Sequence, residues 1–387
     1  MHYSDTQSHR AIQEAIEKLC TRFDDDYWLQ QDQDGTFPHE FHRAVAKGGW
    51  LGIAMPVEHG GSGLGISEAA IMMRAIAQSG AGMSGASAVH INIFGLQPVV
   101  VSGTAAQKAR MLPPLIRGEE KACFAVTEPN AGLNTTKITT RAERAGDRYR
   151  ITGQKIWIST AQVADRALIL ARIGGPTPEK KTAGLSLFYA ALDRSRVEVR
   201  EIRKMGRSAV DSNMLFFDGM EVPAEDLIGA EGAGFRQILH GLNPERILIA
   251  AEAVGLGHAA IRKACRYARE RVVFDRPIGE YQAIQHPLAK CWMNLEAAWL
   301  MALRAAALYD AGHECGAEAN SAKYLAAEAA HAACETAILS HGGMGYSAEY
   351  HVERYLRESY IPRIAPVSAQ MIMNFIGEKV LGLPRSY

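Results

Sequence analysis

Apolar and polar residues follow two different periods along the chain, and the period changes twice. In residues 1–119 the apolar residues recur at helical spacing, as at Ile12, Ile16 and Leu19. A glycine-rich segment at 58–63 and the pair Pro113-Pro114 interrupt this pattern, so we expect helices to break at both places. This stretch is predicted to form an N-terminal helical domain.

The stretch 120–235 changes to short runs that are typical of β-strands. We expect strands at 123–127, 149–151, 156–159, 167–171, 185–189, 197–202 and 214–217. Gly146-Asp147 lies between two polar-apolar runs and is a suitable hairpin turn. Short strands at this frequency predict a central domain built as a small β-barrel or sandwich.

The stretch 236–387 returns to helix, with long segments rich in Ala and Leu. Several of these segments are apolar on more than one face, which suits helices buried in a bundle or between subunits. A chain of 387 residues is also too long for one compact core. We therefore predict an α+β fold, mostly α, in which a C-terminal four-helix bundle follows the helical domain and the β domain.

Composition narrows the class of protein further. Lys+Arg and Asp+Glu both number 42, so the chain has no net charge with which to attract nucleic acid or an anionic membrane. The six cysteines form no CxxC pair and are expected to be reduced thiols, which favours the cytoplasm. The N-terminus lacks the apolar segment of a secretory signal, and no apolar run reaches the ~18 residues of a membrane span.

Several common binding motifs are missing. No GxGxxG follows a strand and no GxxxxGK[ST] is present, so neither a nicotinamide-binding Rossmann site nor a P-loop is expected. His39 and His42 are spaced i,i+3, and the cysteines do not have zinc-ligand spacing. We expect no metal centre.

Two segments of the predicted β domain could bind a ligand. Phe124–Gly132 carries a strand into a loop of small residues, where backbone N–H groups and the Thr127 hydroxyl could meet a ligand. Taken alone, the segment is better explained as a plain strand followed by a turn. In Gly153–Ser159, Trp157 offers a planar face for an aromatic cofactor, or is simply a core tryptophan.

Three further segments lie in the helical C-terminal part. Asn243-Pro244-Glu245-Arg246 reads as a helix start, where Glu245 would stabilise the helix end or act as a catalytic group. The arginines of 271–278 suit phosphate groups or a solvated helix end. The glycines of 342–345 suit a helix cap or a diphosphate.

The order of these motifs from about residue 35 to the C-terminus resembles that of the acyl-CoA dehydrogenase family. The matching motifs are the Pro56–Gly61 segment, FAVTEPNAG, GQKIWIS, the hairpin from Lys204 to Asp218, the block from Arg271 to Gln282, and GGMGY. The resemblance implies a three-domain subunit with FAD at a subunit boundary, commonly in a homotetramer that is a dimer of dimers. It also implies α,β-dehydrogenation of a fatty or branched acyl-CoA, with electrons passed to an electron-transferring flavoprotein.

The resemblance implies roles position by position. The flavin would contact Phe124, Val126, Thr127, Trp157 and Ser159. The diphosphate and adenine would meet Arg271, Phe274, Gln282, Gly342 and Gly343 of a neighbouring subunit, and Ser368 and Gln370 would add further cofactor contacts. Arg246 and Asn243 would contact the substrate in the CoA tunnel.

The same resemblance implies that Glu245 is the catalytic base. Many members of the family carry the base in a C-terminal loop, but that stretch here is Ala365-Pro366-Val367-Ser368, with no carboxylate. A second branch, similar to the isovaleryl- and long-chain enzymes, takes the base from a Glu-Arg pair, which Glu245-Arg246 matches. A glutamate in a desolvated slot is a stronger base for an α-proton.

Pro366 leaves other chemistry open, because the family uses a backbone N–H at this position to bind the thioester oxygen. The Val367 N–H or a ribityl hydroxyl of the flavin would have to replace it. An oxidase, an enoyl-CoA reductase, a lyase, and a flavin- or acyl-CoA-binding protein without catalysis remain the alternatives.

Overall fold

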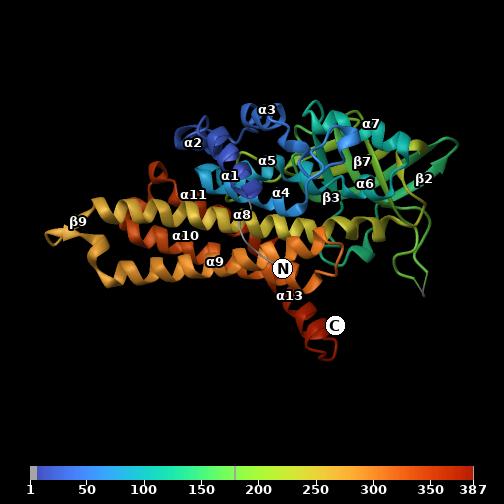
Figure 1. Cartoon of the computed structure of the whole chain (residues 1–387). Helices are drawn as coiled ribbons and strands as arrows, with labels where there is room; N and C mark the ends of the chain where they lie inside the picture. Colours follow the sequence, from blue (N-terminus) through green and yellow to red (C-terminus); the bar gives the residue numbers. More distant parts are fainter. Residues whose placement is uncertain (1–6, 178–179, 387) are drawn as a thin grey trace.

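The computed structural model describes residues 7–177 and 180–386, and it has a sheet flanked by helical domains (Figure 1). The N-terminal domain is helical, as predicted. Its helices are α1 (Gln7–Cys20), α2 (Asp25–Asp34), α3 (His39–Lys47), α4 (Ile66–Ile76), α5 (Gly82–Phe94), α6 (Gln97–Ser102) and α7 (Ala105–Ile116).

Prolines do not end α7 where the sequence pattern placed a stop. The helix runs through Pro113 and Pro114 and ends at Ile116. Thr104 and Gln107 form a capping box at its start, and Pro113 and Pro114 supply no N–H to its last turns, so the helix ends soon after them. The prediction of a break at this pair was therefore wrong by two residues.

A π-helical turn, Ala77–Ala81, joins α4 to α5 and fixes the direction of α5. Gly80 and Gly82 adopt φ values of 120° and 61°, which favour glycine. The buried side chains of Arg354 and Glu358 hold the turn: Arg354 Nη2 donates to the Gly80 carbonyl at 2.7 Å, and Glu358 accepts from the Met83 N–H at 2.6 Å. A Cβ on Gly82 would lie 2.4 Å from Glu358 Oε2, so this joint requires glycine.

The central domain is one eight-stranded sheet. Its strands are β1 (Ala122–Ala125), β2 (Arg141–Ala145), β3 (Arg148–Ser159), β4 (Arg166–Arg172), β5 (Leu185–Ala191), β6 (Val197–Glu201), β7 (Ser212–Pro223) and β8 (Leu227–Ile228). They run in the order β6-β7-β3-β2-β4-β5-β8, and β1 pairs with β4 in parallel. The hairpin predicted at Gly146-Asp147 is confirmed, because Ala145 pairs with Arg148.

The C-terminal domain contains three long helices within the described residues. They are α8 (Gly234–Glu270), α9 (Gln282–Asp310) and α10 (Gly316–His341), followed by α11 (Val352–Ser359), α12 (Ile361–Ile364) and α13 (Ala369–Phe375). A short hairpin, β9 (Val272–Val273) and β10 (Arg276–Pro277), connects α8 to α9 and projects from one end of the molecule (Figure 1).

Helix α8 spans the molecule and packs against both the N-terminal helices and the bundle (Figure 1). The predicted helix start at Asn243-Pro244-Glu245 is wrong, because α8 begins ten residues earlier, at Gly234, and Pro244 lies inside it. The packing of α8 on both sides outweighs the local start signal, because most helix stability in proteins comes from tertiary contacts.

One helical stretch, Ile66–Ser102, is long and apolar enough to cross a membrane, with a mean hydropathy of 1.2. Within this stretch, 78% of the most apolar window is buried inside the protein. Its α4 and α5 belong to the core that includes α8. The stretch therefore has the surroundings of a core helix.

Candidate active site

Glu245 lies on α8 next to Arg246, which lines a surface groove. The groove has a volume of about 410 Å³ and is lined by Asn243 and Arg246 of α8, Asn320 of α10 and Val367 of the loop before α13. From Ile247 to Leu256, every residue of α8 is buried. Glu245 therefore stands where the helix passes from the groove into the core.

The surroundings of Glu245 favour its protonated form. Burial raises the pKa of its carboxyl to about 7, against the opposing attraction of His90 and Arg246. Arg246 itself is held beside the groove, since its Nη1 donates to Asn243 Oδ1 at 3.0 Å and to the Leu242 carbonyl at 3.3 Å. A carboxyl with this pKa can accept a proton near neutral pH.

The loop that holds Pro366 lies beside the same groove. Lys323 of α10 is buried and donates from Nζ to the Val367 carbonyl at 2.5 Å. Burial, followed by the charge of Arg246, lowers the pKa of Lys323 to about 8. The Val367 N–H donates no hydrogen bond within the described part of the chain, so it is available to a ligand.

The two candidate segments of the β domain lie side by side. The Ile156 N–H donates to the Thr127 carbonyl at 2.9 Å. Trp157 follows at a register shift in β3, with φ of 61° and 57% of its surface exposed. The interpretation of Trp157 as a core tryptophan is therefore wrong, because the shift turns its ring outward.

The other predicted contacts on this side differ in exposure. Val126 is buried, while Phe124 and Thr127 are partly buried. The Thr127 hydroxyl makes no hydrogen bond to the described residues. Ser159, at the end of β3, accepts from Arg207 Nη2 at 2.9 Å.

The remaining predicted cofactor contacts lie far from the β domain. Arg271, Phe274 and Gln282 surround the β9–β10 hairpin and are exposed, at the opposite end of the molecule from β3 (Figure 1). Gly342 and Gly343 follow α10, and no atom of the described residues outside their own neighbours lies within 4 Å of a Cβ added to either, which leaves room for a ligand. One chain therefore does not bring the two sets of residues together.

The two C-terminal candidates lie at the start of α13. The Ser368 hydroxyl accepts from the Met371 N–H at 3.4 Å and caps that helix. Gln370 is exposed. Ser368 thus already has a structural role, and Gln370 remains accessible.

Three family models match consecutive parts of the chain. They describe the N-terminal, middle and C-terminal domains of acyl-CoA dehydrogenases, and they match residues 6–119, 123–220 and 232–381. The chain belongs to the acyl-CoA dehydrogenase family. It is therefore an oxidoreductase of a flavoprotein family.

Individual relatives match over nearly the whole length of the chain. Acyl-CoA dehydrogenase FadE12 of Mycobacterium tuberculosis is 37% identical over 392 residues, which cover 100% of this chain and 99% of that protein. The caffeyl-CoA reductase–Etf complex subunit CarC of Acetobacterium woodii is 33% identical, over 90% of this chain and 92% of its own length. The structure of butyryl-CoA dehydrogenase from Megasphaera elsdenii superimposes with a TM-score of 0.93 at 27% identity, covering 98% of this chain and 100% of that one.

An ion pair that the sequence analysis missed joins the two acyl-CoA dehydrogenase motifs FAVTEPNAG and GQKIWIS. Lys155 is fully buried, and its Nζ donates to Glu128 Oε1 at 3.0 Å and to the Val126 carbonyl at 2.9 Å. Glu128 also accepts from the backbone N–H groups of Thr139 and Thr140. Both residues were visible inside their motifs, but their separation of 27 positions gave no signal that they pair.

Arg207 is a second functional candidate that was missed. It is buried with φ of 57°, and it donates to Ser87 at 3.2 Å, to Ser159 at 2.9 Å and to Ser212 at 3.1 Å. It thereby places a positive charge directly behind Ser159. Nothing in the local sequence distinguishes Arg207 from the exposed arginines around it.

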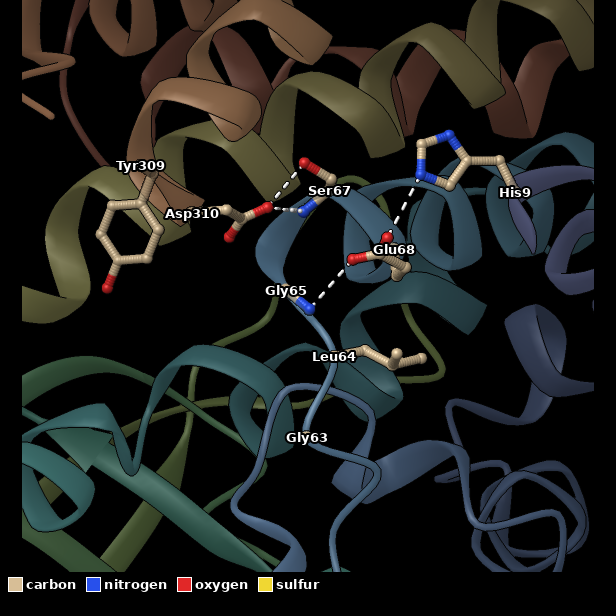
Figure 2. Close-up of a pocket in the computed structure, with 8 residues that line it drawn as sticks. All are labelled: His9, Gly63, Leu64, Gly65, Ser67, Glu68, Tyr309 and Asp310. Carbon is tan, nitrogen blue, oxygen red and sulfur yellow. Dashed lines mark hydrogen bonds and ion pairs between the residues drawn. The ribbon is translucent and has the colours of Figure 1, made fainter. Parts of the chain in front are cut away.

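A second hollow, of about 560 Å³, lies between α1, α4 and the end of α9 (Figure 2). Asp310 caps α4 there by accepting from the Ile66 and Ser67 N–H groups at 2.7 and 2.9 Å. Glu68 accepts from the Gly65 N–H at 2.9 Å and pairs with His9 at 3.2 Å. These acidic groups serve as helix caps, so the hollow is a structural joint.

Residues 7–177 and 180–386 contain no group of three or more His, Cys, Asp or Glu side chains suitably placed for a metal ion. His42, one of the two spaced histidines, is buried, and burial lowers its pKa to about 4.

Proposed function

We propose that the chain is an FAD-dependent acyl-CoA dehydrogenase that converts a fatty or branched acyl-CoA thioester to the 2-enoyl-CoA. The observation that carries this proposal is the position of Glu245, whose pKa burial raises to about 7, directly beside Arg246 of the groove. A base at this position is what removal of an α-proton requires.

The residues present fit a flavin cofactor. Trp157 presents an exposed ring, the Thr127 hydroxyl makes no hydrogen bond within the described chain, and Ser159 accepts a hydrogen bond from Arg207. The open backbone at Gly342 and Gly343 suits a diphosphate. When bound, FAD supplies an acceptor for the hydride that leaves the β-carbon.

Three groups of this chain would act on the substrate. A carboxylate oxygen of Glu245 takes the α-proton. Arg246 and Asn243 orient the CoA thioester at the mouth of the groove. The Val367 N–H donates to the thioester oxygen, in place of the N–H that Pro366 lacks, and so stabilises the negative charge that develops there.

We further propose a homotetramer, a dimer of dimers, in which Arg271, Phe274, Gln282, Gly342 and Gly343 of one subunit complete the FAD site of a neighbour. Gln370, together with Ser368, would add contacts from the C-terminal segment. The domain boundaries are placed near 119/120 and 235/236, where β1 and α8 begin close by.

An electron-transferring flavoprotein is the proposed electron acceptor, since one relative is named as part of a reductase–Etf complex. All six cysteines are free thiols, which suits the proposed cytoplasmic location.

The second candidate function is the reverse reaction, reduction of an enoyl-CoA. The relative named as a subunit of a caffeyl-CoA reductase complex favours it, together with Pro366 in the thioester loop. Oxygen uptake with release of peroxide would distinguish an oxidase from both the dehydrogenase and the reductase.

Anaerobic reduction of the bound flavin by acyl-CoAs tests the proposal. We expect wild-type flavin to bleach, and Glu245→Gln to slow bleaching by about 10²–10⁴-fold while FAD and acyl-CoA still bind. Glu335→Gln, at an exposed glutamate of α10, is the matched control and should bleach like the wild type. Bleaching that is unchanged in Glu245→Gln would move the base elsewhere.

A further inference from the structure

Three buried polar atoms near Glu245 lack a hydrogen-bond partner among the described residues: Arg246 Nε, His90 Nε2 and Glu252 Oε2. Folded proteins rarely leave such atoms unpaired, and each case calls for an explanation. Arg246 lines the groove already assigned to the CoA thioester. His90 and Glu252 have no role in the chemistry proposed above.

His90 and Glu252 form a tight pair between two helices. His90 of α5 lies with its Nδ1 2.5 Å from Glu252 Oε1 of α8, and the Glu252 side chain is fully buried. Burial opposes the charging of His90, but the attraction of Glu252, aided by Glu245, outweighs it and raises the pKa of the imidazole. This shift favours a protonated ring at His90, and the pair leaves His90 Nε2 and Glu252 Oε2 without partners among the described residues.

The His90–Glu252 pair lies along α8 from Glu245, in the direction that the acyl chain of a bound substrate would take. Glu252 follows Glu245 by seven residues, two turns of α8, so both project from the same face about 10 Å apart along the axis. The α8 residues that line the groove lie between Leu239 and Arg246, toward the end of the helix that points away from Glu252. A thioester held at Glu245 with its CoA in the groove therefore directs its acyl chain along α8 toward Glu252.

The strand proposed to face the flavin, β1, lies close to the His90–Glu252 pair. The His90 ring lies 4.7 Å from the Phe94 ring, and Phe94 lies 5.6 Å from Phe124 of β1. His90 thus stands in the corner between the base helix and the strand proposed to face the flavin. An acyl chain that passes between them ends beside its imidazole.

We propose that His90 and Glu252 recognise the acyl end of the substrate and select an acyl-CoA that carries a neutral hydrogen-bonding oxygen, a hydroxyl or a carbonyl, several carbons from the thioester. This inference rests on the proposed function and names its substrate class. His90 Nε2 donates to that oxygen, and a hydroxyl also donates to Glu252 Oε2. A plain alkyl end would leave both atoms desolvated and unpaired.

The charges around the pair favour a neutral group over an anionic one. Burial lowers the pKa of Arg207, against the attraction of Glu358, Asp211 and Glu252. Several acidic side chains therefore already face this cation. The Arg207 Nη atoms are already bonded to Ser87, Ser159 and Ser212. Of the Arg207 nitrogens, only Nε lacks a partner among the described residues, and an added carboxylate would meet the acidic groups that already surround this cation.

The test compares acyl-CoAs that differ only at the acyl end. The FAD-loaded protein is mixed anaerobically with unsubstituted, ω-hydroxy and ω-carboxy acyl-CoAs of about six to ten carbons, a range set by the ~10 Å between the two glutamates. Flavin reduction is followed by absorbance. Dissociation constants for the same compounds are measured by calorimetry on Glu245→Gln, which holds the ligand without turnover.

The variant that removes the site is His90→Phe combined with Glu252→Leu, because replacing both partners by apolar groups leaves no buried charge unpaired. The matched control is His258→Phe combined with Glu296→Leu. This second pair, 3.0 Å apart, joins α8 to α9, and its glutamate is partly exposed. Thermal unfolding of both double variants reports any loss of fold.

We expect the wild type to prefer the hydroxylated member of at least one chain length by about tenfold, the value of one buried hydrogen bond. The His90/Glu252 variant should lose or invert that ratio, and the control should keep it. A wild type that favours the unsubstituted or ω-carboxy compound at every length would overturn the inference. A ratio retained in the His90/Glu252 variant would overturn the inference as well, even if the pH dependence of flavin reduction in that variant changed.

Failure of the proposed function gives a different result. In that case no acyl-CoA of any kind bleaches the wild-type flavin. The calorimetric ratio between hydroxylated and unsubstituted ligands still decides the role of the pair, since binding does not require turnover.

Discussion

At the scale of single residues, the protonation of Glu245 should control the rate. Because burial raises its pKa to about 7, the carboxyl keeps its proton below that pH and cannot accept another from the substrate. We expect flavin reduction at saturating acyl-CoA to rise with pH through about 7 and then level off. Stopped-flow rates between pH 5 and 9 measure this, and constant rates down to pH 5 would contradict it.

Trp157 should matter for the cofactor and hardly at all for folding. Its ring is 57% exposed, so Trp157→Ala removes few contacts and should change the free energy of unfolding by less than about 0.5 kcal/mol. FAD affinity should fall, because the planar face is lost. Trp157→Phe should restore part of that affinity in a fluorescence titration. Full FAD affinity in Trp157→Ala would remove the residue from the site.

The sequence made Glu245 and Trp157 visible but could not give their environments. Pro244 beside Glu245 indicated a helix start, whereas tertiary packing carries α8 through it. Trp157 sits at a register shift, where the alternation used to judge burial no longer holds. The pairing of His90 with Glu252 joins positions 162 residues apart, and no spacing rule predicts such a contact.

At the scale of elements, the buried pair Lys155–Glu128 should hold β3 to the loop after β1. Lys155→Met leaves the carboxylate without its cation, and breaking a buried pair costs about 3–5 kcal/mol of unfolding free energy. We expect a lower melting temperature together with weaker FAD binding, because Val126 and Thr127 lose their anchor. Calorimetry with and without added FAD measures both effects.

The control for this prediction lies in the same sheet. Arg200→Met breaks the exposed pair with Glu198 on β6, which should cost less than about 1 kcal/mol. Equal losses in Lys155→Met and Arg200→Met would show that the buried pair has no special part in joining the two motifs.

Elements were easier to predict than their limits. Apolar periodicity located most of the strands and the helical domains, because it reflects which face meets the core. The strands expected at 149–151 and 156–159 are one strand, β3, whose two register shifts interrupt the alternation. β2 was missed because its residues, RAERA, are mostly exposed and polar.

At the scale of the whole molecule, the order of domains followed from the sequence, but the distance between motifs did not. The motifs around β9 and in β3 match the same family, yet these two elements lie at opposite ends of the molecule (Figure 1). The order of motifs along the sequence contains no distances in space. It could not show that the residues proposed to bind FAD lie far apart within one chain. Only the arrangement of α8, α9 and α10 reveals this.

The exposed end of the bundle has the character of an interface. Phe274 is 86% exposed and Tyr346 87%, and Val272 and Leu339 are also exposed at this end. Solvent-facing apolar groups gathered in this way mark a surface that another protein covers. The residues proposed to meet the FAD diphosphate lie among them. A second subunit would therefore bury this end and complete the cofactor site in one step.

Phe274→Asp tests this coupling, because a carboxylate in an apolar contact opposes association without touching the core. We expect a folded chain of lower mass by sedimentation, with FAD affinity reduced at least tenfold. Val57→Asp, at an exposed valine of the N-terminal domain, should change neither quantity. Phe274 is proposed both to lie in the interface and to border the cofactor, so the mass of the assembly and its flavin content must fall together. A tetramer that loses FAD, or a smaller species that retains it, would separate the two roles and refute a site shared between subunits.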